Sequence, residues 1–301
     1  MDGFYCKVGA EQGLIHPYII PKRFETTPCP SGIPITRAGG GDPLSEKEIF
    51  PMTCLLLLLW TALGLCVGSF CNVLIFRLPR GEEFVKTPSH CMACGHRLRW
   101  YELLPVASWL AQGGRCRSCG EKISAQYPVV EALNGGAWLL AAWLYQAEPL
   151  RAVLYSLLFS LLTVVALIDW RTFEIPNGVN LAIFLLGAVQ LAGDTAHWKT
   201  YLIGMFSVSL LFLLLWFVTK GSGLGMGDVK LMAGAGLLLG WQRILLAMIL
   251  GSVSGAIIHS VRMKRGAPRK LAFGPYLAAG IWVAALVGDR LIAAYLGLFG
   301  L

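Results

Sequence analysis

The chain has 301 residues, of which 56% are hydrophobic and 14% are charged, and its formal net charge is +8. Soluble domains carry about 25% charged residues, so this composition, with a mean hydropathy of +0.63, excludes an ordinary soluble protein. It indicates an integral membrane protein. The basic residues are not interleaved with aromatic ones, and we therefore expect no nucleic-acid partner.

The first segment, residues 1–51, is polar, rich in glycine and proline, and without a helical or strand period. It lacks the basic start, apolar core and cleavage site of a signal peptide. We treat it as an N-terminal tail that is disordered or foreign to the native protein, and we assign it no function.

Apolar runs of membrane-spanning length recur along the rest of the chain. Helices are the default structure for such runs, because they satisfy their own backbone polar groups in lipid. The sequence therefore predicts an all-α polytopic membrane protein with about eight transmembrane helices. A first helix over 52–76 precedes a polar insertion over 77–127, and a membrane core follows over 128–301. The expected spans are 54–76, 128–145, 151–168, 178–193, 200–218, 229–240, 242–261 and 272–298.

Basic residues are concentrated in two connections, 77–127 and 262–271. The connections near 146–151, 194–199 and 240–243 carry one basic residue each. The positive-inside rule therefore places 77–127 and 262–271 in the cytoplasm. Eight spans agree with this assignment, since both basic segments then lie on one side and both chain ends on the other. The basic surface also predicts contact with anionic lipid.

The insertion contains the pattern Cys-x-x-Cys twice, and a glycine follows each pair. Four thiolates suit a tetrahedral zinc ion, and with all four positions taken by protein the metal is expected to be structural. A short polar loop has little core, so metal binding would supply its folding energy. Two disulfides are disfavoured on the cytoplasmic side, although disulfides and idle thiols stay open as alternatives. The predicted ligands are Cys91, Cys94, Cys116 and Cys119.

Two aspartates stand at the edges of apolar runs. Asp169 follows the run 157–168, and Asp228 ends a glycine-rich stretch just before another run. A carboxylate beside hydrocarbon is costly and is most often functional. The eight-span topology places both at the cytoplasmic end of their helices. If they meet, they can share a proton and act as acid and base toward water, which is the chemistry of an aspartyl protease.

The surroundings of the aspartates suit a bound peptide. Pro176 redirects the chain after Asp169, and the glycines of 221–227 allow a peptide backbone to approach closely. Three alternatives remain: helix-capping aspartates without chemistry, a transporter with a carboxylate proton relay, and a zinc-bearing scaffold. The transporter predicts acidic residues deep within the spans, whereas these two lie at span ends.

Taken together, the motifs resemble those of the type IV prepilin peptidases, membrane aspartyl proteases with a GxGD motif. The resemblance covers about 52–280. It rests on Gly68-Ser69-Phe70-Cys71-Asn72-Val73 with Arg77-Leu78-Pro79, on the two Cys-x-x-Cys pairs, on Tyr127-Pro128 before Glu131, on Asp169 followed by Ile175-Pro176-Asn177, on Gly225-Met226-Gly227-Asp228-Val229-Lys230-Leu231, and on Phe273-Gly274-Pro275-Tyr276.

The resemblance implies a function and a set of site residues. Such enzymes cut the short basic leader from prepilins and pseudopilins at the cytoplasmic face of the bacterial inner membrane, serving type IV pili and type II secretion. The family's catalytic aspartates correspond to Asp169 and Asp228. The surrounding motif supplies Gly225, Gly227, Pro176, Asn177 and Lys230.

The resemblance also implies a second activity. Many members methylate the new N-terminus with S-adenosylmethionine, and members with the four-cysteine loop tend to be bifunctional. A peptidase without methyltransferase activity stays open. Because the chain has no glycine-rich nucleotide fingerprint, the methyl-donor site has two broad candidates, the 77–127 insertion and the Gly68 to Asn72 region.

Overall fold

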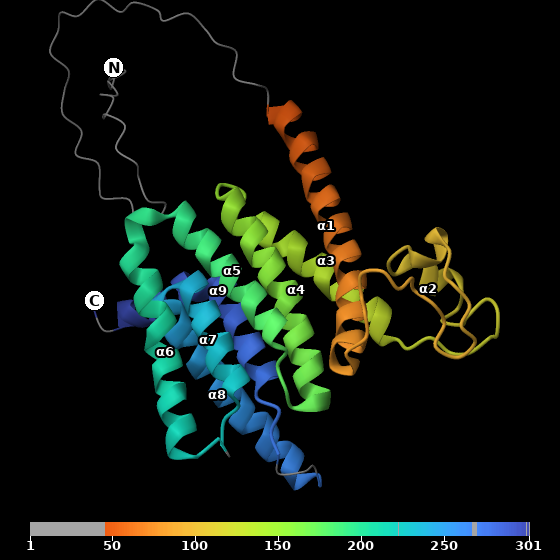
Figure 1. Ribbon diagram of the computed structural model, residues 1–301. Helices are drawn as coiled ribbons and strands as arrows, with labels where there is room; N and C mark the ends of the chain where they lie inside the picture. The colour runs from red at the N-terminus through yellow and green to blue at the C-terminus, as the bar shows by residue number, and fades with distance from the viewer. Residues whose placement is uncertain (1–45, 222, 267–269, 299, 301) are drawn as a thin grey trace, which may run out of the picture. The chain divides into compact units, whose positions relative to one another are not determined.

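The computed structural model describes residues 46–221, 223–266, 270–298 and 300 (Figure 1). Most of the tail expected over 1–51 lies outside these residues. The first helix, α1 (Glu46–Arg77), begins inside that expected tail.

Eight helices of 14 residues or more make up most of the described chain, at the positions of the eight expected spans, and no β-strand occurs among the described residues. This arrangement confirms the predicted all-α fold. The eight helices are α1, α3 (Gln126–Leu144), α4 (Pro149–Thr172), α5 (Asn177–Gly193), α6 (Trp198–Val218), α7 (Met226–Leu239), α8 (Trp241–Lys264) and α9 (Gly274–Leu298).

Five of these helices are long and apolar enough to cross a membrane. They are the helices of the segments Cys54–Arg80, Pro149–Thr172, Thr195–Val218, Trp241–Lys264 and Gly274–Leu298. Of the other three, α5 has 17 residues and α7 has only 14. The chain is thus a membrane protein whose shorter helices lie among longer ones.

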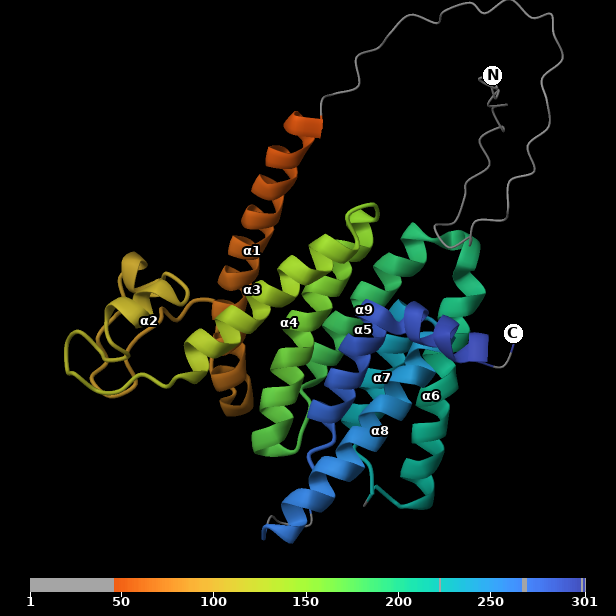
Figure 2. The same ribbon diagram turned by 180° about the vertical axis from the view of Figure 1, so that it is seen from behind.

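The short helix α7 is packed against α5, α6 and α8, as both ribbon views show (Figures 1 and 2). Most residues of α7 are buried among these neighbours. Small residues permit its close packing: a methyl group at Gly236 would overlap the carbonyl of Gly204 on α6, and one at Gly240 would meet Thr200. The small-residue spacing of Gly236 and Gly240 therefore marks a real helix contact.

Helix α1 packs on α3 through Gly64 and Gly68, where an added methyl group would meet Trp138 and Glu131. A buried chain of hydrogen bonds continues from α1 to α4. Asn134 Nδ2 donates to the Gly64 carbonyl at 2.6 Å, and Ser160 Oγ donates to Asn134 Oδ1 at 2.9 Å. Satisfied polar groups of this kind join helices where lipid offers no hydrogen-bond partners.

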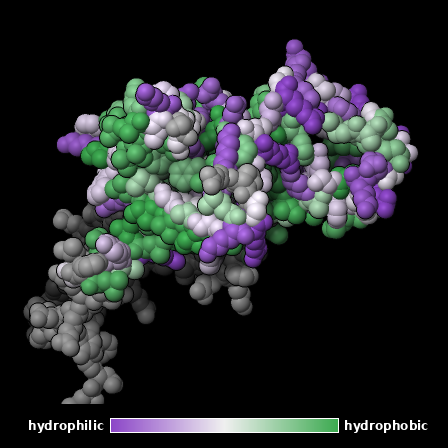
Figure 3. All heavy atoms as spheres, turned by 90° about the horizontal axis from the view of Figure 1, so that it is seen from below, coloured by the Kyte–Doolittle hydropathy of each residue, from purple (hydrophilic) through white to green (hydrophobic). Residues whose placement is uncertain are grey.

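One end of the helix bundle carries the features that matter for function. There α1, α4, α6 and α8 finish, and α5, α7 and α9 begin (Figures 1 and 2). The insertion between α1 and α3 holds a short helix, α2 (Ala107–Ala111), and 3-10 turns at Leu78–Arg80 and Trp100–Leu103. Seen from this end, hydrophilic residues are scattered among hydrophobic ones over the surface (Figure 3).

Candidate active site

Asp169 lies in the last turn of α4 and is only 5% exposed. Its Oδ2 atom accepts a hydrogen bond, at 2.8 Å, from the backbone N–H of Gly274. Gly274 is the first residue of α9. The N-terminus of a helix favours negative charge. Helix α4 then ends at Phe173, whose left-handed backbone (φ 57°) turns the chain back toward the same site.

Asp228 lies in the first turn of α7 and is 7% exposed. Its Oδ2 atom accepts a hydrogen bond from the Gly225 N–H at 3.3 Å, so this carboxylate caps its own helix. Helix α4 finishes and α7 begins at the same end of the bundle (Figure 1). The structure therefore places the two predicted aspartates, both nearly buried, at one end of the bundle.

The other predicted motif residues surround Asp228. Lys230 Nζ donates to Asn177 Oδ1 at 2.8 Å and so joins α7 to the start of α5. A methyl group at Gly227 would lie 3.0 Å from the Ile175 side chain, so the chain between α4 and α5 packs directly on the GxGD turn. Pro176 precedes the first residue of α5 and ends that connection.

The arrangement provides two nearly buried carboxylates on separate helices, each held by one backbone N–H group. Such a pair can remove a proton from water and deliver a proton to a leaving amine.

The four cysteines of the insertion also meet. Their sulfur atoms all lie within 4.8 Å of one another, and all four are free thiols. The Sγ atoms of Cys91 and Cys119 are 3.9 Å apart. A Zn–S bond of about 2.3 Å places the sulfurs of a tetrahedral site about 3.8 Å apart. The cluster therefore has the dimensions of a four-thiolate metal site.

Two matching turns build this cluster. In each, the residue after the second cysteine is a glycine with φ of +72°, Gly95 or Gly120, and its N–H donates to the carbonyl of the first cysteine at 2.9 Å. A left-handed turn favours glycine, which explains why both positions carry one. Backbone N–H groups of Cys94 and Ala93 lower the pKa of Cys91 to about 7, which favours the thiolate that metals bind.

Two family models match the chain. A model described as the Bacterial Peptidase A24 N-terminal domain matches residues 62–145, and one described as the Type IV leader peptidase family matches 156–260. A Prepilin leader peptidase/N-methyltransferase of Pseudomonas putida is 35% identical over 272 residues, covering 80% of this chain and 93% of the relative. The relative of the same name in Pseudomonas aeruginosa is 31% identical over 293 residues, covering 86% and 98%.

The chain belongs to the type IV leader peptidase family. No solved structure matches it. In this leader peptidase the four cysteines fall within the N-terminal family match, and both aspartates fall within the second. The family resemblance expected from the motifs is thereby confirmed.

Two contacts of the leader peptidase site were not anticipated from its sequence. The Gly274 N–H donates to Asp169, and Asn180 Nδ2 donates to the Gly227 carbonyl at 3.2 Å. A glycine-proline pair just before an apolar run is a helix-start signal. That signal identifies the start of α9 as a helix terminus that can bind an anion. It does not reveal which carboxylate binds there.

The close fit at Gly274 yields a prediction. An added methyl group there would lie 2.8 Å from Asp169 Oδ2, so Gly274→Ala should displace the carboxylate and lower leader cleavage by about a hundredfold. Gly297→Ala on the same helix meets nothing within 4 Å and is the matched control. Initial cleavage rates of the two purified variants decide the matter, and equal rates would show that this contact does not position Asp169.

Proposed function

We propose that this leader peptidase removes the short basic leader from prepilins and pseudopilins and then methylates the new N-terminus with S-adenosylmethionine. Relatives named Prepilin leader peptidase/N-methyltransferase support both activities. The observation that carries the peptidase activity is the burial of two carboxylates, Asp169 of α4 and Asp228 of α7, at the same end of the bundle.

In the proposed cleavage, the apolar helix of the pilin lies in the bilayer beside the enzyme, and the leader peptide bond reaches the aspartate pair. One carboxylate takes a proton from water while the water oxygen bonds to the peptide carbonyl carbon. The other carboxylate gives a proton to the leaving amine as the carbon–nitrogen bond breaks. The pair is then ready for another turnover.

We propose that this reaction takes place at the cytoplasmic face of the bacterial inner membrane. The basic insertion follows the end of α1, and Arg262 and Lys264 lie in the last turn of α8, at the end of the bundle where α4 finishes. Basic segments face the cytoplasm. A proton-relay transporter is not supported, since the two acids lie at one end of their helices and not along a path through them.

The cysteine cluster is assigned a structural role. Cys91, Cys94, Cys116 and Cys119 would hold a zinc ion, which keeps the insertion folded when it is bound. All four coordination positions would be filled by thiolates, so no position remains for water or substrate.

The direct test uses the purified full chain in lipid nanodiscs with a purified prepilin and S-adenosylmethionine. Mass spectrometry of the product should show loss of the leader and a gain of one methyl group at the new N-terminus. Omission of the methyl donor should leave cleavage intact. Absence of cleavage by the folded protein would contradict the peptidase proposal, and cleavage without methylation would restrict the function to a peptidase.

A further inference from the structure

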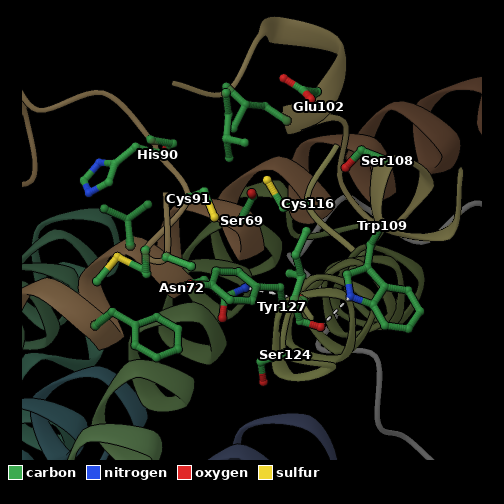
Figure 4. A pocket seen from close by; sticks show the side chains of 18 of the residues that line it. Ser69, Asn72, His90, Cys91, Glu102, Ser108, Trp109, Cys116, Ser124 and Tyr127 are labelled. Carbon is green, nitrogen blue, oxygen red and sulfur yellow. Dashed lines mark hydrogen bonds between the residues drawn. The ribbon is translucent and has the colours of Figure 1, made fainter. Parts of the chain in front are cut away.

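A pocket of about 540 Å³ lies between the cysteine insertion, α1 and α3 (Figure 4). Ligand sites of small molecules have volumes of about 300–1,000 Å³. Its lining includes Ser69 and Asn72 of α1, Tyr127 of α3, and Trp109 and Cys116 of the insertion, all of which Figure 4 labels. The pocket therefore joins the two regions that the sequence offered as methyl-donor candidates.

Two buried acceptor groups line this pocket. Glu131 is 7% exposed, and its Oε2 atom accepts the Val106 N–H at 2.7 Å; its carboxylate also accepts a hydrogen bond from the Ser69 side chain. Asn72 is 1% exposed, and its Nδ2 donates to the Tyr127 carbonyl at 3.1 Å. Its Oδ1 atom accepts no hydrogen bond from the described residues. Buried acceptors require donors, so the pocket is suited to a ligand that is cationic or rich in N–H groups.

Glu131 is more than a charge that suits the start of its helix, which is all that its position in the sequence suggests. Its bond to Val106 holds a β-branched residue at φ 59°, a costly backbone conformation. Strain of this kind persists where surrounding structure enforces it and is concentrated at functional sites. The carboxylate thereby ties the insertion to α3 and remains in the pocket lining.

Aromatic rings connect the pocket to the peptidase site. The rings of Phe76 and Tyr127, both pocket-lining residues, stack at 5.3 Å between centroids. The guanidinium of Arg171 lies over the Phe76 ring at 4.8 Å. Arg171 follows Asp169 closely on α4, so the pocket wall and the catalytic helix are in direct contact.

We propose, building on the function proposed above, that this pocket binds S-adenosylmethionine and that Glu131 accepts the proton of the pilin amine. The ammonium group of S-adenosylmethionine suits the Oδ1 atom of Asn72, which accepts no hydrogen bond from the described residues, and its adenine offers a flat face to the aromatic lining. The new pilin N-terminus is also cationic.

The proposed methyl transfer needs no reactant besides S-adenosylmethionine, the pilin amine and Glu131. Glu131 takes a proton from the pilin ammonium, which leaves a neutral amine. The amine nitrogen forms a bond to the methyl carbon as the carbon–sulfur bond breaks, and its electron pair stays on sulfur. S-Adenosylhomocysteine leaves, and the extra proton on the methylated amine or on Glu131 passes to water.

The experiment has two arms on the full chain in nanodiscs. In the first, ultraviolet crosslinking of radiolabelled S-adenosylmethionine is followed by peptide mapping, and unlabelled S-adenosylhomocysteine competes. The label is expected on pocket residues within 69–131. Label confined to 149–298, or no competed label on an enzyme that cleaves prepilin, would overturn the proposal while leaving the peptidase function in place.

The second arm uses Glu131→Gln, which keeps an oxygen for the Val106 N–H but removes the charge that accepts the proton. Methyl transfer should fall by about a hundredfold or more, while calorimetric binding of S-adenosylhomocysteine and leader cleavage remain. Glu148→Gln, which replaces a partly exposed carboxylate paired with Arg151, is the matched control. Methyl transfer at the wild-type rate by Glu131→Gln would overturn the role of Glu131.

Discussion

Replacing either Asp169 or Asp228 by asparagine should lower the rate of leader cleavage by about a thousandfold or more. Asparagine keeps the size of the side chain and an oxygen for the N–H of Gly274 or Gly225. It cannot exchange a proton with water or amine, and loss of one member of a proton-transfer pair costs at least a hundredfold. Each variant leaves one carboxylate in place, so the loss reports on the pair and not on charge alone.

The measurement is the initial cleavage rate of a purified prepilin, with circular dichroism and size-exclusion profiles to verify the fold. Asp194→Asn is the control, because Asp194 accepts bonds from Tyr201 at 2.7 Å and His197 at 2.8 Å, in the connection between α5 and α6. It should cleave at nearly the wild-type rate. A wild-type rate for either site variant would remove that aspartate from the mechanism.

Loss of the metal from the cysteine cluster should unfold the insertion and abolish methyl transfer. A structural zinc contributes about 10–16 kcal/mol to the folding of small domains, which exceeds the stability available from so short a polar loop. Cys116→Ser should therefore release the metal, expose 78–125 to proteolysis and destroy the pocket that Cys91 and Cys116 line. Leader cleavage should persist within about tenfold, because backbone groups of α7 and α9 hold the aspartates.

Metal content by mass spectrometry, limited proteolysis and methyl transfer should all change together in Cys116→Ser. Cys66→Ser is the matched control, since Cys66 is an exposed cysteine of α1 outside the cluster. An insertion that stays resistant to protease without bound metal, with methyl transfer intact, would show that the cluster does not fold this region.

The long helices and the cysteine cluster could be predicted from the sequence because each depends on local pattern. Apolar runs determine the helices, and the repeated spacing of four cysteines with Gly95 and Gly120 determines the metal-binding turns. The placement of Asp169 and Asp228 at one end followed from counting spans. Topology decides which end a residue occupies, and it requires no detailed contact.

Contacts between distant segments could not be predicted in this way. The bond between Gly274 and Asp169 depends on how α9 packs beside α4, and no local pattern specifies that register. The same holds for Glu131, whose position suggests only a favourable helix dipole. Its bond to Val106 depends on the path of the insertion over α3.

The most direct test of the central claim is the cleavage rate of the double variant Asp169→Asn/Asp228→Asn beside the two single variants. If the carboxylates work as one unit, removing the second costs little once the first is gone, as happens for residues that act together. The account predicts that the double variant cleaves about as slowly as the slower single variant. Losses that multiply would show two independent groups and would contradict it.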